Sequence, residues 1–167
     1  PNHGTIRVGD TLSEAEDLIF TGIPNFAPEI LRRVRLDDPM KAKHMRRALE
    51  SLAEEGVTQV FKPEIGANWI VGVVGQLQLE VLASRIDSEY SIKVHFEQAP
   101  YETARWVSAD DPAELKRFME AHRGNMATDR DGAPVFMGKS AWELGYTLEK
   151  WPKVHFSATR ERAPVAA

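Results

Sequence analysis

The side chains best placed to do chemistry in this sequence are cations that gather in one short stretch. Residues 32–47 include seven basic and two acidic side chains, although the whole chain has a formal net charge of −4. A local basic face on an acidic body can dock on an anionic surface without coating nucleic acid indiscriminately. The candidate contact residues are Arg32, Arg33, Arg35, Lys43, Arg46 and Arg47. The alternative is a solvated face with pairs four residues apart, such as Arg46 with Glu50.

Catalytic and metal-binding patterns are absent from the sequence. The five histidines show no His-x-x-x-His or Glu-x-x-His spacing that would gather metal ligands. Neither a Gly-x-Ser-x-Gly elbow nor the phosphate-binding pattern G-x-x-x-x-G-K-[ST] occurs. Gly72 and Gly75 lack the third glycine of a nucleotide loop, so we assign both to close backbone packing where a strand meets a helix. We therefore predict no catalytic residue, no metal and no cofactor in this chain.

Four tryptophans offer flat rings on which bases could stack, as sheet aromatics do in RNA-recognition modules. The RNP1-like run of such modules is missing, and indoles on apolar stripes usually belong to a core. We therefore expect Trp69, Trp106, Trp142 and Trp151 to be core residues.

The composition is that of a folded globular protein. Of 167 residues, 43% are hydrophobic and 28% are charged, which is enough to build a core. No apolar run approaches the roughly 20 residues that cross a bilayer, and the first residues do not resemble a signal peptide. Because the chain has no cysteine, it has no disulfide or thiolate zinc site, which fits a cytoplasmic protein. The net negative charge argues against general binding to DNA, and we expect no membrane partner.

The elements that position the basic stretch are organised around residues 68–96. An apolar run at 69–74 predicts a buried strand. Leu79, Leu82 and Ile86 lie on one stripe of a helix predicted over 77–90, and a strand with alternating apolar residues follows at 92–97. Strand, helix and strand in so few residues indicate a βαβ unit.

The basic stretch itself forms a strand and a helix before this unit. The strand at 29–36 has Ile30, Val34 and Leu36 on one face, so Leu31 should lie on a partly basic, exposed face with Arg33 and Arg35. A helix is predicted over 39–55, and a strand over 58–62. The helix has Asp38 as N-cap and Pro39 at its first position, a buried stripe of Met45, Leu49 and Leu52, and Gly56 at its end.

The same order of elements recurs after residue 98. Strands are predicted at 102–108, 126–128, 135–137 and 154–158. One helix begins at Asp111 and Pro112 and is closed by Gly124. Its inward stripe is Leu115, Phe118, Met119 and His122. A second helix begins with a capping box of Ser140 and Glu143, and its inward residues are Leu144, Leu148 and Trp151.

The predicted fold class is therefore α+β, with one ferredoxin-like βαββαβ module followed by a second, similarly ordered module. The boundaries are 27–98 for the first module and 99–160 for the second. Residues 1–26 are predicted to end a preceding β-barrel domain and its linker, with strands at 5–8 and 18–20. Residues 161–167 are predicted to be a tail that frays from Arg160. Because the chain starts with Pro1, we interpret it as a fragment of a longer protein.

Several runs together resemble one known family. GDTL at 9–12, FTGIPNFAPEI at 20–30, VGVVGQLQLEVLASRIDSEY at 71–90 and TARWV at 103–107 are closely similar to bacterial peptide chain release factor 3. The GQLQLE run at 75–80 also resembles GELHLE in the third domain of elongation factor G, a related translational GTPase.

The resemblance implies a parent with GTP-binding, β-barrel and C-terminal domains that binds the ribosome in translation termination and promotes departure of codon-reading release factors. GTP and GDP would bind the parent. Its implied partners are ribosomal RNA or a ribosomal protein, together with its own GTPase and barrel domains. We therefore hypothesise that this chain is a non-catalytic docking and coupling module of the ribosome-bound factor. The alternative is a ferredoxin-like regulatory or small-molecule-binding domain, because this architecture hosts many functions.

Overall fold

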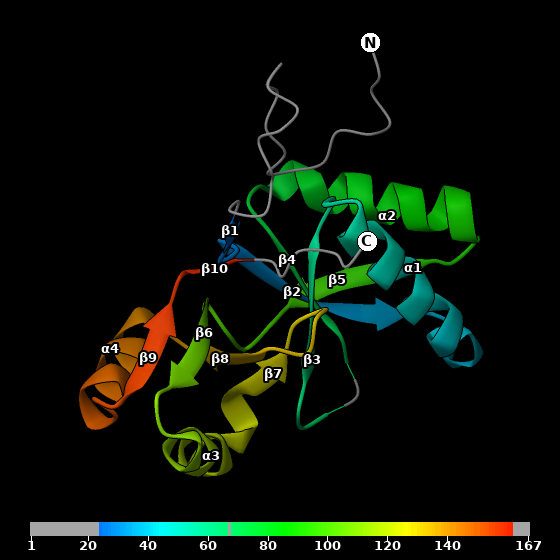
Figure 1. The fold of residues 1–167 in the computed structure, drawn as a ribbon. Coiled ribbons are helices and arrows are strands. Elements are labelled where there is room, and N and C mark those ends of the chain that lie inside the picture. Colours follow the sequence, from blue (N-terminus) through cyan, green and yellow to red (C-terminus); the bar gives the residue numbers. More distant parts are fainter. Residues whose placement is uncertain (1–23, 67, 162–167) are drawn as a thin grey trace, which may run out of the picture.

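One large sheet and four helices organise the computed structural model, which describes residues 24–66 and 68–161 (Figure 1). The sheet has eight strands in the order β5-β2-β4-β3-β7-β8-β6-β9, and β1 pairs with β10 in a separate two-stranded sheet. The elements are β1 (Pro24–Phe26), β2 (Ile30–Leu36), a 3₁₀ turn (Pro39–Lys41), α1 (Ala42–Glu54), β3 (Gln59–Pro63), β4 (Ile70–Val73), α2 (Gln76–Tyr90), β5 (Val94–Gln98), β6 (Thr103–Ala109), α3 (Pro112–Ala121), a second 3₁₀ turn (Arg123–Asn125), β7 (Met126–Thr128), β8 (Pro134–Gly138), α4 (Ala141–Lys150), β9 (Val154–Ser157) and β10 (Thr159–Glu161).

All strand pairs of the sheet are antiparallel, and helices and strands mix as expected for the α+β class. The first half is β5-β2-β4-β3, and the second half is β7-β8-β6-β9. Numbered from the start of each half, the order is fourth, first, third, second in the first half and the mirror of this order in the second. β4 and β5, which flank α2, run in the same direction but are separated by β2.

In the first half, α1 and α2 cover one face of the sheet with an aliphatic core. The Asp38 side chain accepts the Met40 N–H at 3.0 Å, so the predicted cap is confirmed, although the first turn is 3₁₀ rather than α-helical. Met45, Leu49 and Leu52 are buried against Val34, Val60 and Val71, as are Leu79, Leu82 and Ile86 of α2. Gly56, with φ of 86°, follows α1 in the left-handed region that glycine tolerates.

The two glycines around β4 differ from each other. A Cβ at Gly72 would lie 2.5 Å from Cγ of Pro28, so close packing is confirmed there. A Cβ at Gly75 would meet no atom within 4 Å, and its φ of −148° is ordinary extended backbone. The prediction of close packing at Gly75 was therefore wrong.

In the second half, α3 and α4 cover one face with an aromatic core. Asp111 and Ser140 cap the two helices by accepting the N–H groups of Ala113 and Glu143, as predicted. Phe118 is fully buried and packs near the rings of Phe136 and Phe156, at centroid distances of 5.7 and 5.3 Å.

Two expectations about these helices were wrong. α3 ends at Ala121, and Gly124 lies in the following 3₁₀ turn rather than terminating the helix. On α4, Leu148 is exposed, whereas Thr147 is buried and donates its hydroxyl to the Glu143 carbonyl at 2.7 Å. This hydrogen bond lets a threonine occupy the inward position that the sequence pattern had given to leucine.

The two halves pack against each other through the sheet faces that carry no helix. Leu31, Phe61 and Ile70 of the first half share one buried cluster with five residues of the second half: Ala104, Trp106, Ala127, Val135 and Met137. Leu31 is only 2% exposed, so the prediction that it lies on an exposed basic face was wrong. The two halves of this one continuous sheet thus form the two inner layers, with α1 and α2 covering the outer face of one half and α3 and α4 the outer face of the other (Figure 1).

β1 and β10 change the expected ends of the modules. Pro24–Phe26 was assigned to the linker before the first module, but it pairs with Thr159–Glu161. Arg160 was expected to fray, but it lies in this strand and is part-buried. The predicted strands at 5–8 and 18–20, and the tail after residue 161, lie outside the described residues.

Candidate functional site

Three of the six selected cations form one exposed row on α1. Lys43, Arg46 and Arg47 are all exposed; Lys43 and Arg47 lie opposite the buried stripe of the helix, and Arg46 lies on its flank. Arg46 Nε is 4.0 Å from Glu50 Oε1, at the limit of an ion pair, and both side chains are about half exposed. Lys43 and Arg47 make no ion pair within residues 24–66 and 68–161. This row, which we call the α1 basic row, is therefore free to meet an external anion.

The three arginines of β2 do not join the α1 basic row. Arg33 and Arg35 alternate with Val34, whose side chain packs under α1, so they point to the opposite face of the sheet. Arg35 Nη1 donates to Glu97 Oε1 at 2.7 Å, and this hydrogen bond raises the pKa of Arg35 above its ordinary value. Arg32 is part-buried and donates to the Leu31 carbonyl at 2.9 Å. The predicted six-residue surface is thus divided into the α1 basic row, the face of β2 with Arg33 and Arg35, and the part-buried Arg32.

The N-terminal end of α1 is fixed to the C-terminal end of α2. Lys41 Nζ donates to the Ser91 carbonyl at 3.1 Å, and His44 Nε2 lies 3.2 Å from the Tyr90 carbonyl oxygen. Ser91 has a φ of 56° and ends α2 in the left-handed conformation. These two contacts hold the start of α1, and with it the α1 basic row, against the end of α2.

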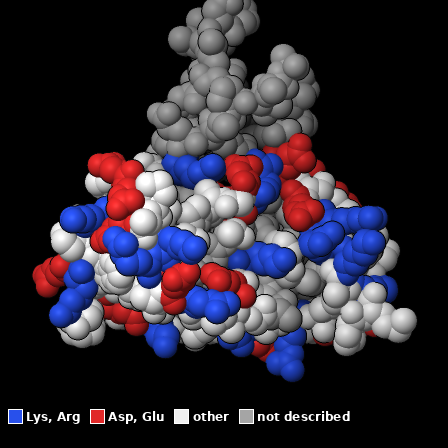
Figure 2. All heavy atoms as spheres, turned by 60° about the horizontal axis from the view of Figure 1, so that its bottom comes forward, with Lys and Arg blue, Asp and Glu red and all other residues white. Residues whose placement is uncertain are grey.

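Charges of both signs are mixed on the face that Figure 2 presents, where Lys and Arg side chains lie among Asp and Glu side chains. Such interspersed charge disfavours indiscriminate adsorption of polyanions, because attractive and repulsive contacts alternate. A specific anionic partner would have to select a local group of cations.

The tryptophans divide into two classes that the sequence did not separate. Trp106 is buried, and Trp69 and Trp151 are part-buried, in agreement with the core assignment. Trp142 is 75% exposed, so its assignment to the core was wrong. Its ring stacks on Tyr146 at a centroid distance of 5.3 Å and an interplanar angle of 15°. This exposed pair on α4 was missed by the sequence analysis.

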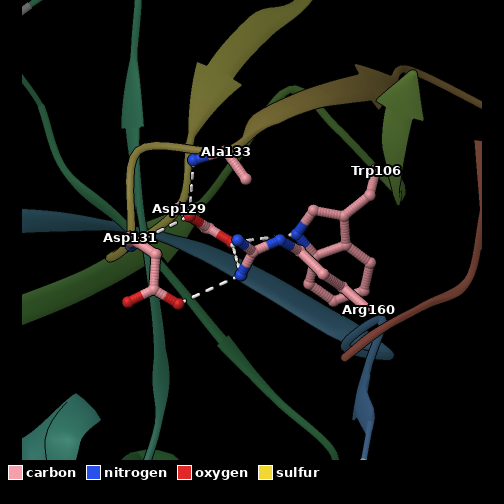
Figure 3. A network of polar contacts seen from close by, with 5 residues as sticks. All are labelled: Trp106, Asp129, Asp131, Ala133 and Arg160. Atoms are coloured by element: carbon pink, nitrogen blue, oxygen red, sulfur yellow. Dashed lines mark hydrogen bonds and ion pairs between the residues drawn. The ribbon is translucent and has the colours of Figure 1, made fainter. Parts of the chain in front are cut away.

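Trp106 also anchors a polar network between the second half and β10 (Figure 3). Its indole N–H donates to Asp129 at 3.0 Å, and the other carboxylate oxygen of Asp129 accepts the N–H groups of Asp131 and Ala133. Arg160 lies 3.4 Å from Asp129 and 3.0 Å from Asp131. Each charged group has a partner, so the network stabilises the fold rather than offering a free reactive group.

A cavity of about 150 Å³ opens beside this network, where the two halves and β1 meet. It is lined by Phe26, Val57, Val74, Trp106 and Asp129, among others. Small-molecule sites typically occupy roughly 300–1,000 Å³, so this cavity is small for a metabolite. In the described parts of the chain, no group of three His, Asp or Glu side chains is placed to hold a metal ion.

Comparison with protein families then decides the identity. The model of the class II release factor RF3 C-terminal domain matches residues 20–148. The chain belongs to this release factor family. The match includes the α1 basic row and every strand of the large sheet except β9, and it confirms the resemblance seen in the sequence. Membership in the RF3 family indicates a role in translation termination, with the ribosome as a general partner. Within the described ranges, no helix is both long and apolar enough to span a bilayer.

Proposed function

We propose that this chain is the ribosome-docking and coupling module of a GTP-dependent termination factor that promotes dissociation of release factors from the ribosome. One observation carries the docking role: the α1 basic row presents Lys43, Arg46 and Arg47 to solvent on a rigid helix with little internal pairing. Phosphate groups of ribosomal RNA, or an acidic ribosomal protein, are the matching partners. Phosphate contacts supply affinity that depends on salt rather than on sequence.

The coupling role is supported by how the module is built. α1 packs on a buried aliphatic core, and the sheet beneath that core packs on the second half through the shared cluster. A displacement of α1 would therefore be transmitted through both clusters. Packed cores move as units rather than deforming continuously. Docking at α1 would therefore shift the whole body, and with it the GTPase and barrel domains that we propose as its partners within the parent.

We further propose that the two halves are ferredoxin-like modules, over residues 27–98 and 99–160. Their strand orders support this assignment, since both correspond to the same fourth, first, third, second arrangement. In this proposal the chain itself hydrolyses nothing, GTP and GDP bind elsewhere in the parent, and the factor acts in the cytoplasm without DNA or membrane partners.

The docking proposal is tested by reversing the α1 basic row in the full-length factor as Lys43→Glu, Arg46→Glu and Arg47→Glu. We expect weaker ribosome binding and a slope of log affinity against log salt that is smaller by about 2–3, because each lost phosphate contact removes about 0.7–0.9. The matched control reverses three other exposed basic side chains, Lys62, Lys93 and Lys116, with the same change in net charge. Equal effects of the two triple variants would contradict a specific role for α1.

A small-molecule function is the second candidate, and two cavities favour it: the one of about 150 Å³ beside Asp129, and one of about 400 Å³ against α3 that is lined by Leu115, Met119 and Arg123 among others. Thermal-shift measurements of the chain with metabolites and nucleotides separate the two candidates. A stoichiometric ligand that raises the melting temperature, together with unchanged ribosome binding in the α1 variant, would favour this candidate over docking.

A further inference from the structure

The outward face of α4 carries an aromatic pair that nothing in the fold requires. Trp142 and Tyr146 are one helical turn apart and are 75% and 47% exposed, whereas the inward face of α4 buries Leu144 and Thr147. Their rings stack nearly parallel, at an interplanar angle of 15°. Since Tyr146 covers only one side of the indole, the other side of Trp142 presents a flat ring to solvent.

A cation continues this row along the helix. Lys150 Nζ lies 5.3 Å from the centroid of the Tyr146 ring, one further turn along α4. From Trp142 to Lys150 the helix rises by about 12 Å, at about 1.5 Å per residue. The row therefore presents an open indole at one end and a positive charge at the other.

The carboxylates near this row do not cancel the positive charge of the lysines around α4. Glu143 accepts the Asn125 side-chain amide at 2.8 Å and the Lys139 backbone N–H at 3.3 Å, so its charge is already engaged. Glu149 is exposed and is the acidic neighbour of Lys150. Lys139 and Lys153 flank the two ends of α4 and make no ion pair within the described ranges.

We propose that Trp142, Tyr146 and Lys150 form a stacking site for an unpaired RNA base. The base would cover the open side of Trp142, and Lys150 would meet a phosphate of the same strand. Aromatic side chains bind single-stranded nucleic acid in this way because every base has a flat π-face. The site lies on the half of the molecule that does not carry the α1 basic row, and it rests on the proposed function only for the ribosomal source of the RNA.

The ring geometry favours a base over a proline-rich peptide. Proline-rich segments dock into grooves between aromatic walls. Here the two rings stack on each other, which leaves no slot between them. A base instead extends the existing stack by one ring, and a cation at its end suits a phosphate rather than a proline.

Two titrations test this site. In the first, the 167-residue chain is added to fluorescein-labelled decaadenylate, and the fluorescence anisotropy gives the affinity. In the second, unlabelled decaadenylate is added to the chain, and the tryptophan fluorescence is followed. We expect quenching of tryptophan emission, because Trp142 is the most exposed of the four indoles. Trp142→Ala should weaken binding by about tenfold and abolish the quenching, and Trp142→Phe should retain most of the affinity. Lys150→Ala should lower the salt slope by about 0.7, the value for one phosphate of a single strand.

Two matched controls separate stacking from general exposure. Met40→Ala removes another exposed apolar side chain, which is 93% exposed, and Lys116→Ala removes another exposed lysine; neither should change affinity or slope. Unchanged affinity in Trp142→Ala, absence of decaadenylate binding by the wild-type chain, or quenching by decaproline instead would overturn the proposal. Because the α1 basic row is intact in these variants, failure here is distinguishable from failure of ribosome docking.

Discussion

The two halves of this molecule share one strand order but achieve it with different side chains. In the first half, the core between the sheet and the helices consists of aliphatic residues such as Leu49, Leu82 and Ile86, and the outer face of α1 carries cations. In the second half, the corresponding core is built from aromatic rings around Phe118, and the outer face of α4 carries Trp142 and Tyr146. The topology therefore constrains where apolar side chains are needed but not which ones, and each half is free to present a different surface chemistry.

Truncating the centre of the aromatic core is the strongest way to test this difference. Phe118 is fully buried and packs edge-to-face on Trp151 and Phe156, with 5.3 Å between ring centroids in each case. Phe118→Ala should lower the free energy of unfolding by about 3–5 kcal/mol, measured by urea denaturation. Phe118→Leu, an aliphatic replacement of the kind used in the first half, should cost clearly less. An equal loss in both variants would mean that ring geometry matters as much as volume.

Two glycine-to-alanine changes, one in each half, should shift stability in opposite directions. At Gly72 an added Cβ would meet Pro28 and Phe61, so Gly72→Ala should destabilise by about 1–3 kcal/mol. At Gly145, inside α4, an added Cβ meets nothing within 4 Å, so Gly145→Ala should stabilise by about 0.5–1 kcal/mol through higher helix propensity. The measurement is the urea midpoint of each variant. A Gly72→Ala variant as stable as the wild type would refute the packing described around Gly72, and a destabilised Gly145→Ala variant would refute the open space at Gly145.

The smallest expected effect comes from a surface network in the first half. Arg85 is within ion-pair distance of both Glu89 and Glu55, and its hydrogen bonds to Glu89 hold the pKa of Glu89 below the ordinary 4.5. This contribution to stability is present above pH 4.5 and is lost as the pH falls through the lowered pKa of the folded state. Glu89→Gln should therefore reduce stability slightly at pH 7 and flatten its decline in acid.

Urea titrations at pH 7 and at pH 3 measure this effect. Glu120→Gln is the control, because Glu120 is an exposed carboxylate on α3 without an ion pair in the described ranges. If both variants show the same acid dependence, the Arg85 network contributes nothing measurable.

Local signals in the sequence predicted most helices and strands. Caps such as Asp38, Asp111 and Ser140 depend on the few residues beside them, and apolar periodicity fixed the inward faces of α1 and α2. The release factor family was also predicted correctly, because short runs kept the family's order along the chain.

The packing of the two halves could not be predicted in the same way. Leu31 follows the alternation of a basic strand, and only contact with distant residues such as Trp106 makes its face a core. Trp142 was misassigned because several stripes could be drawn on α4, and the buried hydrogen bond of Thr147 selected one of them. Of the candidate site, the sequence located the α1 cations and placed Arg33 and Arg35 opposite Val34, but it could not show that α1 packs on the Val34 face and is thereby separated from these two arginines.

The shared cluster between the two sheet faces limits how this domain can be divided. β3 and β7 join the two halves of the large sheet through two residue pairs, Lys62 with Thr128 and Pro63 with Ala127, and β1 with β10 adds three pairs in a separate two-stranded sheet. If the chain were cut near residue 98 and the halves separated, few backbone pairs of the large sheet would be lost, but Leu31, Phe61 and Trp106 would all become exposed to solvent. The two halves therefore share one buried cluster, and either half expressed alone would expose an apolar sheet face that favours aggregation.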